Sequence, residues 1–284
     1  MNDIPRRQKW RKMKKRQTAE TENLLRSNER WCMNACSRFS GLKTSKGKVW
    51  TLTGNSGKIT AFIVHVRYSL LPVLCGVTDI PPPDFLRGFF TNALIHSYQG
   101  RKNDILILET ALEKIGLSAP EKIDYDLMCI DRPPSDYLAA GPSGLVIRKP
   151  SADDLDGLAA LHAGYEKEEV LPESSEFSAA ASRLNTERIL KREQILVAEL
   201  DGRLIGKINT NAVTFTRYQI GGVYVHPDYR SLGVARRMIG IFTADLVSRG
   251  RGVSLFVKKS NPGARSVYRR VGFEILGDYR IGYF

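Results

Sequence analysis

Residues 222–238 combine an apolar strand, a glycine-bearing turn and the start of a helix. The strand ends at Val225, because the proline two positions later lacks the N–H donor that a strand needs. The turn contains Gly233, which lets the main chain approach a ligand closely. Such a turn presents free backbone N–H groups at the positive end of the helix dipole. The segment therefore predicts a site for anionic phosphates, with Arg230 and Arg236 as further positive charge.

Two patterns in this half of the chain resemble the signatures of a known family. Residues 230–235, Arg-Ser-Leu-Gly-Val-Ala, resemble the R/Q-x-x-G-x-G/A motif of the GNAT superfamily of N-acyltransferases. Residues 261–273, Asn-Pro-Gly-Ala-Arg-Ser-Val-Tyr-Arg-Arg-Val-Gly-Phe, are similar to that family's second signature, N-x-x-A-x-x-x-Y-x-x-x-G-F. The patterns stand in the family's order and on the expected elements. The resemblance covers residues 145–284, roughly half of the chain.

The resemblance implies acetyl-CoA as co-substrate and a role for each matching position. Main-chain groups of Val223, Tyr224 and Val225 are expected to hold the acetyl group and the pantetheine arm. Backbone N–H groups are expected to cradle the pyrophosphate beside Arg230, and they belong to Ser231, Leu232, Gly233, Val234, Ala235 and Arg236. Asn261, with Ala264 in the same pattern, is expected to contact the pantetheine arm. Tyr268 is expected to donate a proton to the departing thiolate.

In this family the amine attacks the thioester directly, so no nucleophilic side chain is required. The attacking amine must still lose a proton, and many relatives use a Glu on the strand that corresponds to residues 219–225. That strand here reads Gln-Ile-Gly-Gly-Val-Tyr-Val and has no carboxylate. The base therefore stays open, and the candidates are Glu166, Glu168, Glu169, His162 and His226. The simpler explanations are a solvated helix face for the Glu cluster and an apolar helix row for His162.

Three functions compete at this point. The leading one is transfer of an acetyl group to a primary amine of a small molecule or a protein, and the tyrosine of the second signature favours it. The second is a CoA-binding sensor without turnover, which the missing strand carboxylate favours. The third is a nucleic-acid-associated protein that uses the basic start of the chain. We expect no metal, because no histidine stands at metal spacing beside the scattered Cys32, Cys36, Cys75 and Cys129.

The elements that must position these residues alternate between helix and strand. After a strand at 145–148, the spacing predicts a helix at 152–166 capped by Ser151, a helix at 182–193, and a meander of strands at 194–200, 203–213 and 219–225. A helix at 233–249, a strand at 252–257, a helix at 262–271 and a strand at 273–280 follow. This order predicts an α/β fold with a mixed, mostly antiparallel sheet flanked by helices.

The first half repeats this order and predicts two GNAT-like lobes in tandem. Its expected elements are a helix at 18–39, strands at 48–53, 58–68 and 70–77, a helix at 84–97, a strand at 105–108, a helix at 110–115 and a strand at 122–130. The turn at 78–84 lacks the phosphate motif and contains three prolines, so we expect no CoA in this lobe. The lobe is expected either to wall the acceptor site or only to pack beside it.

The predicted domains are a basic arm at 1–17, a degenerate GNAT-like domain at 18–131, a linker at 132–144 and a GNAT acetyltransferase domain at 145–284. Eight Lys or Arg residues and one Asp fall within residues 1–16, in a chain of net charge +13. A solvated arm is favoured over contact with nucleic acid, since only Trp10 interleaves as an aromatic residue. No apolar run could span a bilayer, so we expect a cytoplasmic protein without a membrane partner.

Overall fold

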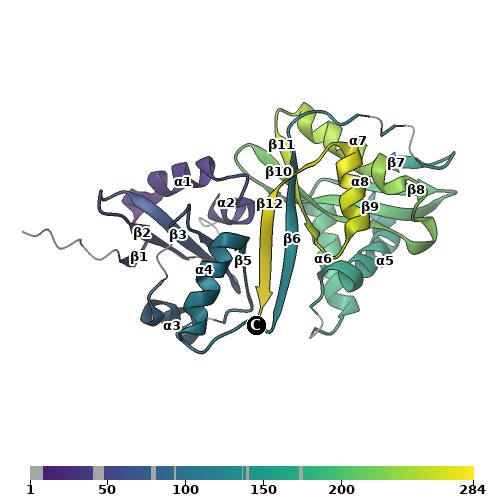
Figure 1. Cartoon of the computed structure of the whole chain (residues 1–284). Coiled ribbons are helices and arrows are strands. Elements are labelled where there is room, and N and C mark those ends of the chain that lie inside the picture. Colours follow the sequence, from purple (N-terminus) through teal and green to yellow (C-terminus); the bar gives the residue numbers. More distant parts are fainter. Residues whose placement is uncertain are drawn as a thin grey trace, which may run out of the picture. The chain divides into compact units, whose positions relative to one another are not determined.

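The chain forms two compact units in the computed structural model. The structure describes residues 9–40, 48–77, 81–92, 94–135, 137–138, 141–172 and 175–284. The first unit contains Met1–Asp126 together with Gly277–Phe284, and the second contains Leu127–Leu276. Figure 1 labels the elements of both units. The last residues of the chain thus belong to the first unit, whereas the sequence pattern assigned them to the second.

The first unit is built on a sheet in which the strand order is β1-β2-β3-β4-β5, followed by β12 and β6. The strands are β1 (Trp10–Lys12), β2 (Lys48–Thr53), β3 (Ile59–Val66), β4 (Ser69–Val73), β5 (Ser97–Arg101), β6 (Glu121–Ile130) and β12 (Glu274–Tyr283). Neighbours from β1 to β4 are antiparallel, whereas β4 and β5 are parallel. β12 pairs with β5 from Tyr279 to Tyr283, which is why the chain's end belongs here.

The helices of the first unit correct two predictions. They are α1 (Thr18–Ser27), α2 (Met33–Ser40), α3 (Pro83–Asn92) and α4 (Lys102–Glu113). The single helix predicted at 18–39 is two helices, because α1 ends at Ser27 and α2 begins at Met33. The strand predicted at 105–108 is wrong, since these residues lie in α4, which buries Ile105, Leu108 and Leu112 on one face. A short apolar run fits both periods, and only its packing decides between them.

The basic start of the chain is only partly a solvated arm. Residues 1–8, including Arg6 and Arg7, lie outside the described ranges. The following residues form β1, which pairs antiparallel with β2 from Trp10↔Leu52 to Lys12↔Trp50. The Trp10 ring faces inward and stacks on Phe85, with 5.5 Å between ring centroids. Residues 9–17 are therefore part of the sheet unit rather than a separate arm.

The second unit has the predicted order of elements. Its helices are α5 (Leu155–Tyr165), α6 (Ala179–Arg192), α7 (Val234–Ser248) and α8 (Pro262–Val271). Its strands run in the order β11-β10-β9-β8-β7 and are β7 (Val146–Arg148), β8 (Ile195–Leu200), β9 (Arg203–Val213), β10 (Arg217–Val225) and β11 (Gly252–Lys258). Neighbours from β7 to β10 are antiparallel, and β10 and β11 are parallel. The predicted α/β class with a mixed, mostly antiparallel sheet is confirmed.

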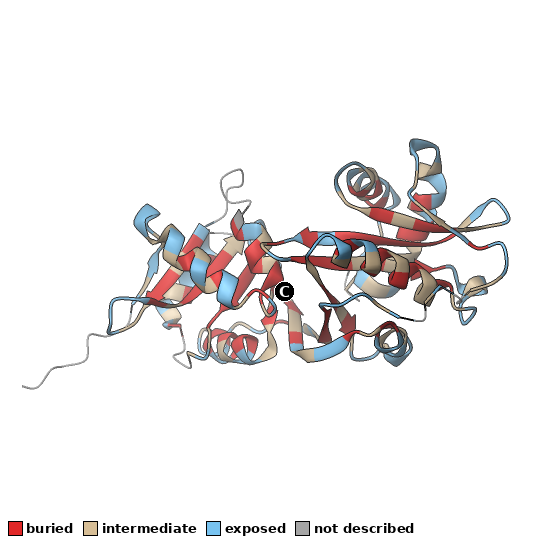
Figure 2. Ribbon diagram, turned by 90° about the horizontal axis from the view of Figure 1, so that it is seen from above, coloured by how far each residue is buried: buried red, intermediate tan, exposed pale blue. Residues whose placement is uncertain are grey.

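Helices cover both faces of this sheet because its strands are apolar on both sides. Val197 of β8 packs with α5 and α6, whereas its neighbour Ala198 packs in the larger cluster with α7 and α8. Successive strand residues point to opposite faces, so the two clusters lie on opposite sides of the sheet. The buried residues, red in Figure 2, follow the strands, and exposed residues lie on the outer sides of the helices.

Neither membrane spans nor metal groups are apparent in the described part of the chain. No helix there is long and apolar enough to cross a bilayer. No cluster of His, Cys, Asp and Glu there is suited to hold a metal ion. The cysteines are free, and the Sγ atoms of Cys32, immediately before α2, and of Cys36, in its first turn, lie 3.6 Å apart.

An ionic cluster fastens the end of β12 within the first unit. The Arg280 guanidinium donates to both oxygens of Asp124, at 2.7 and 3.1 Å, and to Glu109 Oε2 at 3.0 Å. Lys102 Nζ donates to Asp124 at 2.7 Å, and the Tyr98 hydroxyl donates to Glu109 at 2.7 Å. Hydrogen bonds from Arg280 lower the pKa of Asp124 to about 2. Loss of the guanidinium would leave two shielded carboxylates without their main partner.

We expect Arg280→Met to lower the free energy of unfolding by about 3 kcal/mol, as removal of one partner from a buried ion pair does. The measurement is denaturant unfolding of the full chain, followed by circular dichroism. Arg132→Met is the control, because the Arg132–Glu274 pair is 76% exposed on both sides and should contribute less than about 1 kcal/mol. Equal losses of unfolding free energy for the two substitutions would contradict the stabilising role of the Arg280 ion pairs.

Candidate functional site

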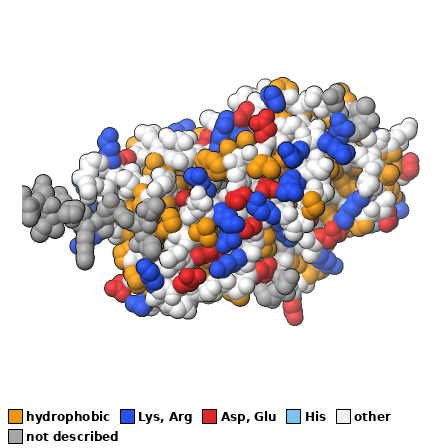
Figure 3. All heavy atoms as spheres, in the orientation of Figure 1, with side chains coloured by type: hydrophobic (Ala, Val, Ile, Leu, Met, Phe, Trp, Pro, Cys, Tyr) orange, Lys and Arg blue, Asp and Glu red, His pale blue; other side chains and the backbone are white. Residues whose placement is uncertain are grey.

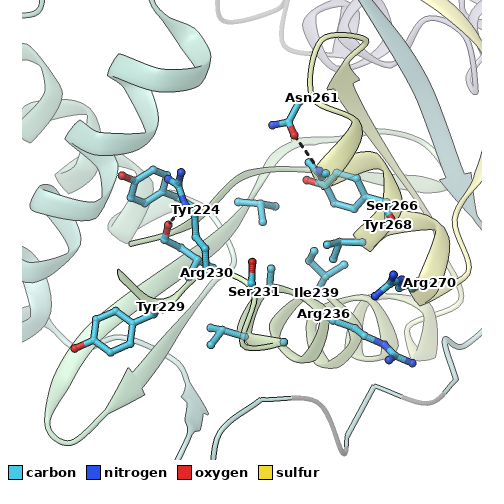
Figure 4. A pocket seen from close by; sticks show the side chains of 18 of the residues that line it. Tyr224, Tyr229, Arg230, Ser231, Arg236, Ile239, Asn261, Ser266, Tyr268 and Arg270 are labelled. Carbon is cyan, nitrogen blue, oxygen red and sulfur yellow. Dashed lines mark hydrogen bonds between the residues drawn. The ribbon is translucent and has the colours of Figure 1, made fainter. Parts of the chain in front are cut away.

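A cavity of about 740 Å³ lies in the second unit, lined by residues of β10, of the turn and first residues of α7, and of α8. Its lining contains Tyr268 and all of the predicted coenzyme-binding residues except Leu232. The others are Val223, Tyr224, Val225, Arg230, Ser231, Gly233, Val234, Ala235, Arg236, Asn261 and Ala264. Figure 4 shows Asn261 and Tyr268 facing Tyr224 and Arg230 across this cavity. The side chain of Leu232 is half exposed.

The turn before α7 places two residues in the left-handed backbone region. Ser231 has a φ of 64°, and Gly233, the N-cap residue of α7, has a φ of 85°. Glycine adopts this conformation without the steric cost that other residues carry. Among the described residues no side chain caps α7, so its first N–H groups have no intrahelical or capping partner. A helix start of this kind attracts anions.

Arg230 is engaged by the protein rather than free. Its Nε donates to the Val225 carbonyl at 3.0 Å, and its Nη2 donates to Glu168 at 2.8 Å. The Tyr224 hydroxyl donates to the same carboxylate at 2.9 Å. Burial, followed by this carboxylate, raises the pKa of Tyr224. Arg230 therefore holds the end of β10, and Glu168 offsets the positive charge that the sequence pattern assigned to ligand binding.

A bulge in β10 brings the strand's main chain to the cavity. The pairing of β10 with β9 shifts register between Gly221 and Tyr224. Gly222 has a φ of 58°, and a Cβ atom there would collide with Asn209 and lie 2.7 Å from Lys207 Nζ. Both the backbone conformation and the lack of space thus require glycine at this position. The adjacent residues 223–225 line the cavity.

The bulge rests on Lys207, which the sequence reasoning missed. This lysine of β9 is 1% exposed, and its Nζ donates to the Gly222 carbonyl at 2.9 Å and to Asn209 Oδ1 at 3.3 Å. The ammonium also lies 4.7 Å from the centre of the Tyr165 ring. Burial lowers the pKa of Lys207 to about 7, against a smaller opposing effect of Glu166. The sequence carried one signal for this residue. Lys207 stands inside the apolar stretch 204–208, and the next strand contains the pair Gly221-Gly222.

Asn261 and Tyr268 occupy one side of the cavity because of how α8 begins and packs. Asn261 caps the helix, since its Oδ1 accepts the Ala264 N–H at 2.9 Å, and Pro262 follows at the first helical position. The Tyr268 ring is 7% exposed and packs edge-on against Phe273, with 5.9 Å between centroids. Burial, and then Tyr165 and Glu169, raise the pKa of Tyr268. The phenol therefore keeps its proton, as a proton donor must.

The predicted base candidates separate into two groups. Glu168 and Glu169 line the cavity, whereas Glu166, His162 and His226 do not. Glu166 pairs with His162 at 3.2 Å, and burial lowers the pKa of His162 to about 4. The half-exposed His226 lies 3.6 Å from Asp228.

One short segment delivers both cavity carboxylates. Residues Glu166–Val170 form a π-helical turn after α5, a feature that often marks functional sites. Glu168 reaches Tyr224 and Arg230, as described above. Glu169 accepts from Asn261 Nδ2 at 2.9 Å and lies 3.8 Å from Lys258 Nζ. Its negative charge also raises the pKa of Tyr268, and both side chains line the same cavity.

Comparison with known proteins identifies the domain that holds this cavity. Residues 159–273 match the family model described as "Acetyltransferase (GNAT) family". An acetyltransferase of Sodalis glossinidius is 32% identical over 83 residues, which are 28% of this chain and 56% of the relative. The chain spans 56–64% of the length of the curated relatives that it matches. The second unit contains a GNAT acetyltransferase domain.

Solved structures share the fold over nearly the whole chain. A GCN5-related N-acetyltransferase of Sphaerobacter thermophilus matches with a TM-score of 0.61 and 20% identity, over 98% of this chain and 95% of that protein. A tandem GNAT protein from the clavulanic acid biosynthesis pathway matches with a TM-score of 0.57 and 12% identity, over 97% and 98%. The predicted arrangement of two GNAT-like lobes in tandem is confirmed at the level of the fold.

The burial of Lys207 predicts a pH dependence of stability. Its pKa of about 7 in the folded chain lies below its ordinary value of 10.5, so between these values the unfolded chain binds a proton that the folded chain lacks. The free energy of unfolding should therefore rise with pH across this window, by at most about 1.4 kcal/mol per pH unit. Lys207→Met should remove this part of the slope in denaturant titrations from about pH 7.5 to about pH 9.5.

Lys149→Met is the matched control, because Lys149 is exposed and should keep the slope of the unmodified protein. A slope for Lys207→Met equal to that of the unmodified protein would show that the buried lysine does not titrate in this range.

Proposed function

We propose that this protein is an N-acetyltransferase that moves the acetyl group of acetyl-CoA to a primary amine. One observation carries the proposal: a single cavity holds the uncapped start of α7, the bulged main chain of β10 and the buried phenol of Tyr268. These are the features needed to bind a diphosphate, align a thioester and protonate a thiolate. The GNAT family match over residues 159–273 supports the same reaction class.

The diphosphate of the coenzyme would bind at the start of α7. The N–H groups from Ser231 through Arg236 supply the donors, and the helix dipole supplies positive potential. Arg236 of α7 and Arg270 of α8 both line the cavity, and Figure 4 shows them on the same side of it. Because Glu168 already offsets the charge of Arg230, we assign the countercharge for the phosphates to Arg236 and Arg270.

The pantetheine arm and the acetyl group would lie between β10 and α8. The main chain of Val223 to Val225 offers strand-like partners to the amide groups of the arm, and Asn261 faces it from the cap of α8. This path leads from the start of α7 to Tyr268. Alignment of the thioester by fixed main-chain groups reduces the entropy cost of the reaction.

The reaction would proceed by direct attack. The amine nitrogen forms a bond to the thioester carbon, the carbon–sulfur bond breaks, and the Tyr268 phenol donates its proton to the departing sulfur. The ammonium of the acceptor passes one proton to Glu169, which lines the same cavity as Tyr268, and the second proton, which the nitrogen releases as the amide forms, restores the phenol. Both small molecules and proteins carry suitable amines.

A CoA-binding protein without turnover is the second candidate. The observation that favours it is the lack of any carboxylate in β10, where Gln219 is buried and its Oε1 has no partner among the described residues. An acetyl-transfer assay over a panel of primary amines separates the two candidates. Transfer to any amine, above the rate of spontaneous acetylation, excludes the second one.

The acid role of Tyr268 predicts that Tyr268→Phe lowers kcat by about 100-fold, a typical contribution of general acid catalysis. The affinity for acetyl-CoA, measured by calorimetry, should change by less than about twofold, because the ring and its packing are kept. Phe273→Leu is the packing control and should alter stability more than kcat. Unchanged turnover in Tyr268→Phe would remove the acid assignment.

The base role of Glu169 predicts a loss that depends on pH. Glu169→Gln should lower kcat/KM by about 100-fold near neutral pH, where a primary amine is protonated, and by much less near pH 10, where free amine is abundant. Glu168→Gln is the control, since its carboxylate pairs with Arg230 and should affect coenzyme affinity instead. A pH-independent loss in Glu169→Gln, or a larger one in Glu168→Gln, would contradict this role.

A further inference from the structure

The strongest feature outside the acetyl-transfer site is a groove of about 960 Å³ in the first unit. We call it the basic groove. Its lining comes from residues 9–17, from α1, and from the end of β2 with the turn that follows it, and contains Lys9, Arg11, Lys12, Lys14, Arg16, Gln17, Glu20, Thr53, Gly54, Asn55 and Gly57. The pairing of β1 with β2 fixes Arg11 and Lys12 beside β2. The basic residues of the groove are thus part of the folded first unit and not of a flexible tail.

Cations outnumber acids in the lining of the basic groove. Five of its lining side chains are cations, and one, Glu20, is an acid. The Glu20 carboxylate is occupied, because its Oε1 accepts the Ile59 N–H at 2.7 Å. None of the five cations forms an ion pair within the described part of the chain. By contrast, acidic and basic side chains are interspersed over the centre of the face drawn in Figure 3.

Mutual repulsion of unpaired cations favours a ligand that presents several negative charges in a row. The lining contains no apolar side chain, which a membrane surface would need as an anchor. It also contains no aromatic ring, because Trp10 is turned inward against Phe85. A platform for the stacking of single-stranded bases is therefore missing. The basic groove is therefore suited to contact phosphates and not to read bases.

We propose that the basic groove binds the phosphate backbone of a nucleic acid duplex, without sequence preference. Lys and Arg side chains release counterions when they contact backbone phosphates, and this release supplies the free energy of binding. The contact is independent of the acetyl-transfer site, since every lining residue belongs to the first unit. The protein would then hold its acetyl-transfer activity close to nucleic acid.

The test is fluorescence anisotropy of a labelled duplex of mixed sequence with the full chain, over a range of sodium chloride concentrations. We expect binding at low salt, with a linear fall of log K against log salt concentration and little difference between duplex sequences. The double substitution Arg11→Glu with Lys14→Glu should weaken binding at least tenfold at about 50 mM salt and should reduce the slope.

The matched control is Lys149→Glu with Arg203→Glu, which changes the net charge equally at exposed residues of the second unit. The control should leave the affinity within about twofold. Both proteins should keep the thermal midpoint and the acetyl-CoA affinity of the unmodified chain, which shows that they fold.

Three outcomes would overturn the proposal. The first is an absence of salt-dependent duplex binding. The second is an equal loss in the two double substitutions, which would indicate net charge alone. The third is binding of inorganic polyphosphate or of phosphatidylserine vesicles at concentrations where the duplex does not bind, which would assign the basic groove to a different anion.

Discussion

The site depends on backbone N–H groups that the fold leaves without partners at the start of α7. A helix cannot satisfy its first N–H groups internally, and here no described side chain caps them. The left-handed conformations of Ser231 and Gly233 expose these groups on the cavity side. The end of β10, which leads into this turn, must keep a fixed position. Arg230 fixes it by donating to the Val225 carbonyl and to Glu168.

The need to hold main-chain segments in place also explains the charged side chains around the cavity, of which Lys207 is buried. Lys207 supports the Gly222 carbonyl at the bulge of β10, although burial of an ammonium is costly. Glu169 ties the cap of α8 to the turn after α5 through Asn261. Each of these contacts fixes a main-chain segment that faces the cavity. The first unit has the same order of elements, but prolines precede its α3, and residues 78–80 of the corresponding turn lie outside the described ranges.

Sequence reasoning located the cavity because its key residues carry local signals. A glycine turn before a helix is readable from spacing, whereas Asn261 and Tyr268, which belong to one helix and its cap, came from the resemblance of residues 261–273 to the family signature. Twelve of the predicted positions meet in one cavity. Long-range pairing was not readable. The engagement of Arg230 by Glu168 depends on residues 62 positions apart, and Lys207 looks like any strand lysine until its surroundings are known. The error at 105–108 and the assignment of residues 277–284 have the same origin, since only tertiary packing decides them.

Isothermal titration of the full chain with acetyl-CoA tests the central claim most directly, with Gly233→Val compared to the unmodified protein. Gly250→Val is the control, because Gly250 also has a positive φ, of 74°, and has open space around it. We predict saturable heat for the unmodified protein and for the control, and an affinity at least tenfold weaker for Gly233→Val. No heat with the unmodified protein, or equal affinity in Gly233→Val, would contradict the binding of a diphosphate at the start of α7.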